Sequence, residues 1–336
     1  MHRPGPHDNR PEAAERIGLA VAALLRRHPE RFEPGIPLSS LTTLRIGGSA
    51  LGLAKLRNSE DARRFLENAR DAEIPAVCLG GGSNVLADDR GFCGLVGVMS
   101  DRTLEIRGDT VRAGAGIPFD ELVVGSLQAG LTGLEFASGI PGSLGGALVG
   151  NAGCYGHEIG EFLREAVVLR QDGRIETVGP EAFAFAYRHT AFKERRDVVL
   201  EAVLTLGRGD VDAALAERAD HLASRRAKHP VDLPCAGSWF KNLPPAEPGG
   251  RRQAAGALLE TVGAKRLRIG DAGVFAGHAN IIVNLGCARS DDVLALAAAM
   301  RAAVQERYGI RLEAEVRHLA WLADPALPGD PWAFRG

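Results

Sequence analysis

The sequence predicts an α+β protein built from two or three domains. Its 336 residues exceed the roughly 100 to 150 that one ordinary core organises. Segments with the period of strands and segments with the period of helices follow one another, and no repeat of about 20 to 50 residues indicates a solenoid or a propeller. With 45% hydrophobic and 24% charged residues, the composition is that of a folded globular protein rather than a disordered one.

Charge and cysteine content restrict the partners. The 40 basic and 42 acidic residues give a formal charge of -2, so no overall field attracts nucleic acid or an anionic membrane, and a phosphate-bearing ligand must meet a local cationic site. Five scattered cysteines lack the CxxC spacing of a zinc site, and no apolar run approaches the roughly 20 residues that span a bilayer. We expect a cytoplasmic protein with reduced thiols, no metal, no nucleic-acid or membrane partner, a small-molecule substrate and a monomeric state.

Residues 1–36 are predicted to form a tail followed by a helix over residues 12–27, and we assign them no chemistry. A first α+β unit, about residues 37–100, contains a helix at residues 59–72 with Ser59 as its N-cap. An apolar strand at residues 74–79 then runs directly into three glycines.

A second unit, about residues 101–209, is predicted from two hairpins with turns at residues 108–109 and 172–173. A helix over residues 118–129 and an apolar strand over residues 198–206 complete it. No long linker follows, but the strand-rich pattern ends there.

A boundary near Gly209 separates residues 37–209 from a C-terminal α+β domain, residues 210–325. The three helices and the final strand predicted for this domain are residues 210–228, 254–262, 291–308 and 311–319. Alternation along the final strand places Glu315 and Arg317 on one face.

Two glycine-rich segments are the first candidates for a binding site. GGGSN at residues 80–84 follows a strand, so its backbone N–H groups can approach an anion closely, although a plain tight turn explains it as well. SGIPGSLGGALVGNAGCYG at residues 138–156 indicates backbone that bends sharply or lies flat against a planar group such as a flavin; bulges and sheet corners are the alternative. Neither segment is a GxGxxG or P-loop motif.

Three further segments place ionisable or hydroxyl groups among small or apolar neighbours: AYRHT at residues 186–190, AGSWFKN at residues 236–242 and LEAEVRHLA at residues 312–320. A surface turn explains the first, and a helix cap or turn serine explains the second. A solvated strand face with ion pairs explains the third. The pattern by itself favours these ordinary explanations over a catalytic site.

These segments, with TTLRIGGSA at residues 42–50, resemble motifs of the UDP-N-acetylenolpyruvoylglucosamine reductase family. The family patterns NTFRIGGxA, LGGGSNxL, GxxGIPGxxGGAxxxNAGxYG, YRxS, GSxFKNP and LExEVRxxG have counterparts here in that order. The resemblance implies FAD held by two N-terminal units of the vanillyl-alcohol-oxidase type, beside a C-terminal substrate domain. The cofactor-binding residues that it implies are Arg45, Gly80, Gly81, Gly82, Ser83, Asn84, Ser138, Gly139, Ile140, Pro141, Gly142, Gly145, Gly146, Asn151, Gly153 and Tyr155.

The same resemblance implies that NADPH reduces the flavin, which then reduces UDP-N-acetylglucosamine enolpyruvate to UDP-N-acetylmuramate for peptidoglycan. It makes Arg188, Ser238 and Glu315 the catalytic residues. Hydride addition to the enolpyruvyl group leaves an enolate, which Arg188 can stabilise and Ser238 can protonate with help from Glu315. The substrate-binding residues implied are Tyr187, Lys241, Asn242, His278, Asn280 and Arg317.

The chain departs from the family pattern at six positions, namely Thr42, Gly150, Leu243, Asp271, Phe275 and Gly277. The short spacing between Thr190 and Val198 favours the subgroup that lacks a substrate-capping tyrosine loop. Two alternatives stay open: an FAD-linked oxidase of the same superfamily, acting on a small alcohol or sugar, and a catalytically silent paralogue that binds flavin or a nucleotide sugar.

Overall fold

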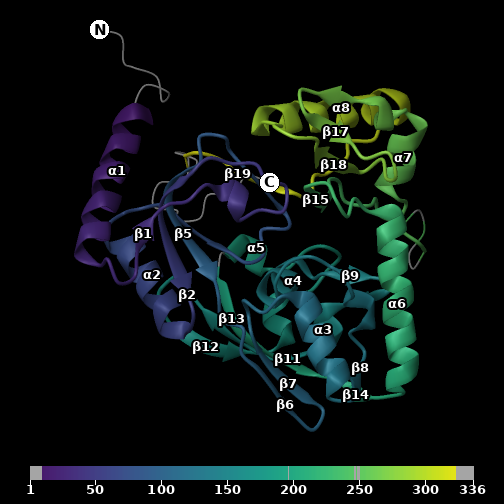
Figure 1. The fold of residues 1–336 in the computed structure, drawn as a ribbon, viewed down its shortest axis with the longest axis horizontal. Helices are drawn as coiled ribbons and strands as arrows, with labels where there is room; N and C mark the ends of the chain where they lie inside the picture. The colour runs from purple at the N-terminus through teal and green to yellow at the C-terminus, as the bar shows by residue number, and fades with distance from the viewer. Residues whose placement is uncertain (1–9, 196, 246, 248–249, 323–336) are drawn as a thin grey trace.

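The computed structural model describes residues 10–195, 197–245, 247 and 250–322, and it confirms the α+β class. Three units, each with its own sheet, are arranged around the centre of the molecule (Figure 1). Each unit has its own buried apolar cluster. Within the described residues, no helix combines the length and the apolar character needed to cross a membrane.

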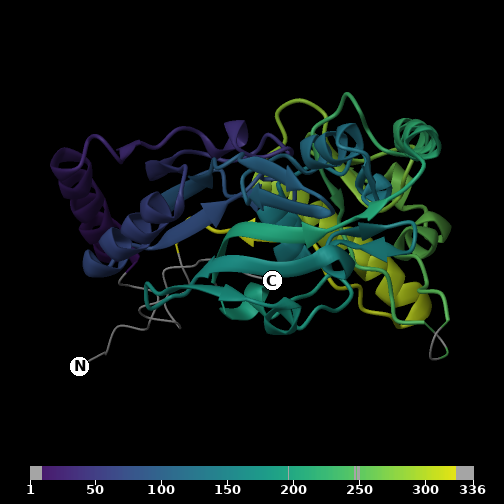
Figure 2. The ribbon, with the colours of Figure 1, turned by 90° about the horizontal axis from the view of Figure 1, so that it is seen from below.

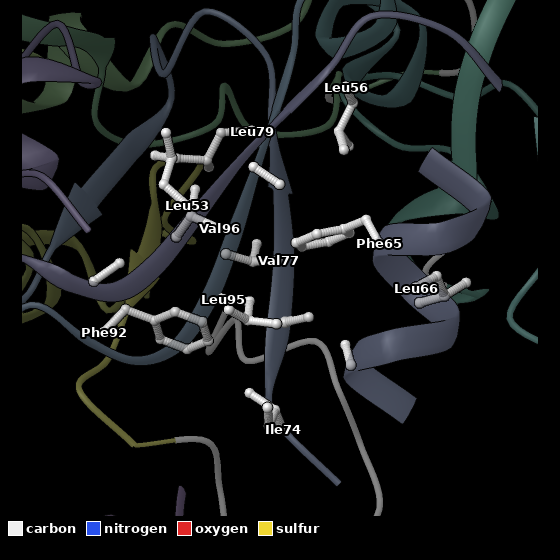
Figure 3. Close-up of a cluster of buried hydrophobic side chains, with 14 of the residues drawn as sticks. Leu53, Leu56, Phe65, Leu66, Ile74, Val77, Leu79, Phe92, Leu95 and Val96 are labelled. Atoms are coloured by element: carbon white, nitrogen blue, oxygen red, sulfur yellow. The ribbon is translucent and has the colours of Figure 1, made fainter. Parts of the chain in front are cut away.

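The first unit is a four-stranded sheet in which the last three strands in sheet order are parallel, while the first pairs antiparallel with the second. In sheet order its strands are β1 (Glu33–Pro34), β2 (Ala50–Leu56), β5 (Phe92–Met99) and β3 (Ala76–Leu79). Helices α1 (Arg10–Arg27) and α2 (Ser59–Asp71) pack against this sheet. Phe65 of α2 points toward the side chains of the strands, as Figure 3 shows, and Leu66 belongs to the same buried cluster. Because β3 ends at Leu79, the glycine-rich loop that begins at Gly80 directly follows this sheet.

The second unit is a five-stranded antiparallel sheet. In sheet order its strands are β12 (Ile175–Val178), β11 (Leu163–Leu169), β13 (Val198–Thr205), β7 (Thr110–Gly114) and β6 (Leu104–Arg107). In Figure 2, the teal strands of this sheet cross the middle of the view. The first unit lies to their left and the C-terminal part of the chain to their right. Both predicted hairpins are confirmed, and they pair β6 with β7 and β11 with β12.

Helices and short elements complete the second unit. Its helices are α3 (Phe119–Gln128), α4 (Leu144–Gly150) and α5 (Phe192–Arg195). Two small ribbons pair β8 (Leu131–Thr132) with β14 (Gly207–Arg208) and β9 (Gly153–Cys154) with β10 (His157–Glu158). The 3-10 turns of the chain are η1 (Leu38–Ser40), η2 (Glu135–Ala137), η3 (Ile159–Phe162), η4 (Pro180–Phe183) and η5 (Ala264–Arg266).

The third unit is a four-stranded antiparallel sheet covered by two helices. Its strands in sheet order are β15 (Cys235–Ser238), β18 (Ile281–Asn284), β17 (Ala272–Val274) and β16 (Arg268–Ile269), and its helices are α7 (Ala255–Thr261) and α8 (Ser290–Tyr308). The last strand, β19 (Arg317–Leu319), leaves this unit and pairs in parallel with β4 (Val85–Ala87). The C-terminal segment therefore ties the third unit to the first glycine loop.

Helix α6 (Val211–Lys228) runs along one side of the molecule toward the third unit (Figure 1). Asp210 caps its first turn by accepting from the N–H groups of Asp212 and Ala213. The helix packs against α3 and η2, and Ala214 is buried with the core of the second unit. It thus connects the two units while resting on the second.

Two local predictions were wrong. The N-cap of α2 is Asn58, whose side chain accepts from the Asp61 N–H at 2.8 Å, while Ser59 is already helical. The final strand covers only Arg317–Leu319, because the chain bends at Val316. Ala314 forms an isolated bridge with Phe240, and the chain then crosses to β4, so one regular alternation cannot hold over residues 311–319.

Candidate active site

The two glycine-rich segments lie against each other. A Cβ on Gly80 would come within 2.2 Å of the Ser143 Oγ, and a Cβ on Gly81 within 2.7 Å of the Gly142 Cα. Gly82 has φ +60, and a side chain there would meet the Leu41 carbonyl. The first loop therefore needs glycine because the second loop and Leu41 occupy the space that side chains would fill.

A hydrogen bond also joins the two loops, since the Ser83 hydroxyl donates to the Pro141 carbonyl at 2.9 Å. Beside them lies a cavity of about 150 Å³ with mostly apolar walls. It is lined by Cys78, Gly80, Met99, Ser143, Gly145, Gly146, Val149, Phe192, Lys193, Asp197, Val198, Val199 and Arg317. Bare glycine backbone together with apolar side chains in the lining suits part of a flavin nucleotide.

The remaining residues of the implied cofactor set have varied surroundings. The Ser138 hydroxyl is buried and has no hydrogen-bond partner among the described residues. Gly139 donates its N–H to Asp120, and Arg45 has a left-handed φ of 55°. Tyr155 is half exposed and stacks on His221, with ring centroids 3.8 Å apart. Tyr155 does not line the small cavity.

Asn151 and Gly153 position another side chain of the site. Asn151 is buried, and its side chain donates to the Glu158 carboxylate and the Ala186 carbonyl. The backbone carbonyls of Asn151 and Gly153 accept from the guanidinium of Arg188, at 3.4 and 2.8 Å. The end of the second glycine segment thus holds Arg188 in place.

Arg188 occupies a strained turn. Ala186 and His189 exchange N–H to carbonyl hydrogen bonds of 3.0 Å, so Tyr187 and Arg188 are the two central residues of the turn. Arg188 has φ 54, a left-handed conformation that is uncommon for a residue with a side chain. The surface-turn explanation is correct for the backbone, but the guanidinium points inward and binds Glu315 at 3.0 Å.

Glu315 lies where three segments meet. Its N–H donates to the Trp239 carbonyl at 2.8 Å, and its carbonyl accepts from the Asn84 side chain at 3.1 Å. Burial raises the pKa of Glu315, while Arg188, Lys193 and Lys241 act in the opposite direction. Its side chain is 19% exposed and paired, so the solvated-face explanation is wrong for this residue.

Ser238 is the last residue of β15 and pairs with Ile281. It directly precedes Trp239, which accepts the N–H of Glu315. The backbone therefore brings Ser238 into the same small region as the Arg188–Glu315 pair, although the three residues are far apart in the sequence. Its position at a strand end replaces the helix-cap explanation.

The other implied substrate residues fall into three groups. Lys241 and Arg317 line a second cavity, and Lys241 pairs with Glu313 there. Asn242 and Tyr187 are linked, because the Tyr187 hydroxyl accepts from the Asn242 N–H at 3.4 Å.

His278 and Asn280 stabilise the backbone beside the site. The buried Asn280 side chain exchanges hydrogen bonds with Phe240, accepting from its N–H at 2.9 Å and donating to its carbonyl at 2.8 Å. His278 accepts from the Asn280 N–H, and burial lowers its pKa. Neither lines the second cavity.

The second cavity has a volume of about 530 Å³ and is strongly cationic. Five basic side chains line it against two carboxylates, Glu313 and Glu315. The basic residues are Lys193, Lys241, Arg301, Arg311 and Arg317. Such an excess of positive charge suits a ligand that carries phosphate or carboxylate groups. Because the chain as a whole is nearly neutral, a phosphate-bearing ligand needs a local cationic site of this kind.

Sequence reasoning missed Lys193, Arg301 and Arg311. The sequence did carry a signal for Arg301, because this residue interrupts an alanine-rich stretch of the predicted helix. In the structure, its buried Nε has no hydrogen-bond partner among the described residues. Lys193 carried no signal beyond its closeness to the YRxS-like segment.

Comparisons with known proteins agree with this arrangement. Residues 229–319 match the model of the UDP-N-acetylenolpyruvoylglucosamine reductase C-terminal domain, and residues 50–179 match an FAD binding domain. The chain is 40% identical to UDP-N-acetylenolpyruvoylglucosamine reductase 2 of Symbiobacterium thermophilum over 90% of its own length and 96% of the relative. The chain belongs to the UDP-N-acetylenolpyruvoylglucosamine reductase family.

Further relatives cover a similar share of the chain. The reductase of Syntrophomonas wolfei is 35% identical over 86% of this chain and 95% of the relative. The crystal structure of the reductase from Thermus caldophilus superimposes with a TM-score of 0.72 at 34% identity, covering 87% of this chain and 99% of that one. The expected family and FAD-binding domain are therefore confirmed.

The structure explains three departures from the reductase family pattern. A Cβ on Gly277 would come within 2.5 Å of the Phe275 ring, so glycine at 277 leaves room for the ring in the position it has here. Leu243, which stands in the place of the family proline, donates its N–H to the Gln253 carbonyl at 3.0 Å, a bond that proline cannot make.

Asp271, which replaces a family glycine, stabilises the turn that precedes α8. Its carboxylate accepts from the Cys287 N–H at 2.9 Å and from Arg268 at 2.8 Å. Three of the departures are thus accommodated within the third unit, without changing Arg188, Ser238 or Glu315.

Proposed function

We propose that this chain reduces UDP-N-acetylglucosamine enolpyruvate to UDP-N-acetylmuramate in peptidoglycan precursor synthesis, with FAD as its bound cofactor and NADPH as the donor. The observation that carries the proposal is the meeting of Arg188, Glu315 and the Ser238 strand end beside a glycine-lined cavity and a cationic one. Bound FAD supplies a carrier that accepts a hydride from one reactant and passes it to the other.

Arg188 is the residue that stabilises negative charge. A guanidinium stays protonated throughout, and hydride addition to the enolpyruvyl double bond leaves an enolate. Backbone carbonyls and Glu315 already fix the guanidinium, so little reorganisation is needed when the charge develops.

Ser238 donates the proton that completes the reduction, and Glu315 positions or assists that transfer. A hydroxyl is a weak acid, but a carbanion-like enolate is basic enough to take its proton when the geometry is held. The raised pKa of Glu315 supports this role, because a carboxyl group with such a pKa can carry a proton closer to neutrality.

Lys241, Asn242, Arg317, Tyr187, His278 and Asn280 are assigned to substrate binding or its support. The cationic wall around Lys241 and Arg317 suits the diphosphate and the carboxylate of the substrate. We propose the two glycine loops, with Arg45, Ser138, Asn151 and Tyr155 around them, as the FAD site.

In this proposal, residues 37–209 hold the cofactor and residues 210–325 hold the substrate. Residues 323–325 lie outside the described part of the chain. A cytoplasmic monomer suits this function, because the nucleotide-sugar substrate is a cytoplasmic precursor.

The decisive test is a visible spectrum followed by two anaerobic additions. NADPH should bleach the flavin band, and UDP-N-acetylglucosamine enolpyruvate should restore it. Bleaching without recovery would indicate a flavoprotein with another acceptor. A colourless protein that FAD does not reconstitute would contradict the cofactor assignment.

Ser238→Ala tests the proton donor. We expect bleaching by NADPH to stay near the wild-type rate, while recovery with the enolpyruvyl substrate slows by about 10² to 10⁴-fold, as loss of a general acid does. Stopped-flow absorbance measures both steps, and Ser40→Ala, an exposed serine that bonds only Pro37, is the matched control. Equal slowing of both steps would mean that the role of Ser238 is misassigned.

A further inference from the structure

Lys193 occupies the boundary between the two cavities. It lines the small cavity of the glycine loops and also the cationic cavity, a position that it shares with Arg317 among the described lining residues. It belongs to the short helix α5, whose Phe192 ring stacks on Phe183 with centroids 4.2 Å apart. The buried hydroxyl of Thr190 holds the preceding turn by donating to the Val149 carbonyl at 2.7 Å. Lys193 therefore projects from a rigid support.

Its ammonium group is connected to the turn that presents Arg188. The Lys193 Nζ donates to the Arg188 carbonyl at 2.6 Å, and Arg188 is the residue with the left-handed φ. An ammonium group has three donors, so this contact leaves hydrogen-bonding capacity for the cavities. Lys193 thus lies next to the catalytic arginine without being part of the family motifs.

The surroundings of Lys193 bring its pKa closer to neutrality than that of an ordinary lysine. The pKa of Lys193 is lowered to about 8, chiefly by burial and also by the neighbouring cations Lys241, Arg317 and Arg188, while Glu315 acts in the opposite direction. A lysine with this pKa remains mostly protonated near pH 7. The other charged groups around the two cavities are Asp197, Arg301, Arg311 and Glu313.

We propose that Lys193 is a further active-site residue whose ammonium group stabilises the negative charge that the bound flavin gains on reduction. A hydride brings two electrons and one proton, so its transfer to the flavin adds one negative charge. A cation lining the same cavity favours that charged state and raises the reduction potential of the cofactor. This inference rests on the proposed function, and it assigns to Lys193 a role distinct from those of Arg188, Ser238 and Glu315.

The test compares two variants. Lys193→Met keeps a long unbranched side chain but removes its charge, and Lys193→Arg keeps the charge. The matched control is Lys55→Met, at an exposed lysine of β2 that pairs with Glu33. Each protein is loaded with FAD, its flavin content is measured, and its midpoint potential is determined by anaerobic titration against a reference dye.

We expect the methionine variant to lose about tenfold in the preference for reduced over oxidised flavin, which is a fall of about 30 mV for a two-electron couple. The arginine variant and the Lys55 control should stay near the wild-type potential. The gap between wild type and Lys193→Met should narrow as the pH rises through about 8, because the wild-type lysine then loses its charge.

An FAD-loaded Lys193→Met protein with the wild-type potential at pH 7 would overturn the inference. If that variant does not retain FAD, Lys193→Gln is judged by the same criterion. The two proposals fail separately. A wild-type flavin that NADPH bleaches and the enolpyruvyl substrate restores, with no change of potential in the variant, would leave the proposed function intact and remove only the role of Lys193.

Discussion

Two arginine–carboxylate pairs in this molecule have the same chemistry and opposite surroundings. Arg218 of α6 binds Asp120 of α3 through two parallel contacts of 2.6 and 2.8 Å, and the Asp120 side chain is 40% exposed. Arg188 binds Glu315 through a contact of 3.0 Å, and the Glu315 side chain is 19% exposed. The first pair joins two helices, whereas Glu315 of the second pair lines the cationic cavity.

The two carboxyl groups respond in opposite directions. The Arg218 hydrogen bonds, helped by the Gly139 N–H, lower the pKa of Asp120 and outweigh its burial. Burial raises the pKa of Glu315 and outweighs Arg188, two of whose N–H groups are directed at backbone carbonyls. A bidentate pair with a partly solvated carboxylate therefore favours the charged carboxylate, whereas a buried carboxylate whose arginine also binds backbone carbonyls is shifted toward its protonated form, as the proposed proton transfer requires.

The two ion pairs should differ most in their effect on the rate of flavin reoxidation by the enolpyruvyl substrate. Arg188→Met should slow recovery of the flavin band with the enolpyruvyl substrate by about 10² to 10³-fold, because it removes a preorganised stabiliser of the enolate. Arg218→Met, with the same change of side chain, should lower the stability but leave the rate of the FAD-loaded protein close to wild type. Stopped-flow measurements on both variants decide this, and similar slowing in the two would erase the distinction.

The next effect is on stability. Asp120→Asn should lower the free energy of unfolding by about 1 kcal/mol, since it weakens charge-assisted hydrogen bonds that solvent partly screens. Urea denaturation measures the loss. Glu315→Gln should cost less, because the raised pKa of Glu315 shows that the folded protein favours the neutral form of this side chain. A larger loss for Glu315→Gln would mean that the active-site pair is the stronger support of the fold.

The smallest effect is the pH dependence of these stabilities. The folded pKa of Asp120 is lowered, so its contribution is present above the unfolded value of about 3.9 and disappears only as the pH falls through the folded pKa. The folded pKa of Glu315 is raised, so its charge costs stability at neutral pH and that cost disappears as the pH falls toward about 4.3.

Urea midpoints between pH 7 and pH 4 measure this difference. The advantage of wild type over Asp120→Asn should hold across that range. Any advantage of Glu315→Gln should be greatest at pH 7 and shrink toward pH 4. Parallel pH profiles for the two variants would contradict the opposite pKa shifts.

Much of the local structure followed from the sequence because short-range chemistry controls it. The hairpin turns at Gly108 and Gly173 appear where the residue types predict them. The cap of α2 was misplaced by one residue, since Asn58 and Ser59 are both good N-caps. The final strand was overextended, because alternation cannot reveal that the chain changes partner after Ala314.

The sequence by itself determined the family, and it identified the two glycine-rich loops as a candidate FAD site and Arg188, Ser238 and Glu315 as candidate catalytic residues, because ordered motifs and glycine density are local properties of the chain. Only the tertiary structure decided that Glu315 binds Arg188, that Asn151 and Gly153 hold that arginine, and that Lys193 lines both cavities. The physical reason is that burial and charge pairing arise between segments far apart in the sequence, so the pKa of Glu315 and the surroundings of Lys193 exist only once the three units have packed together.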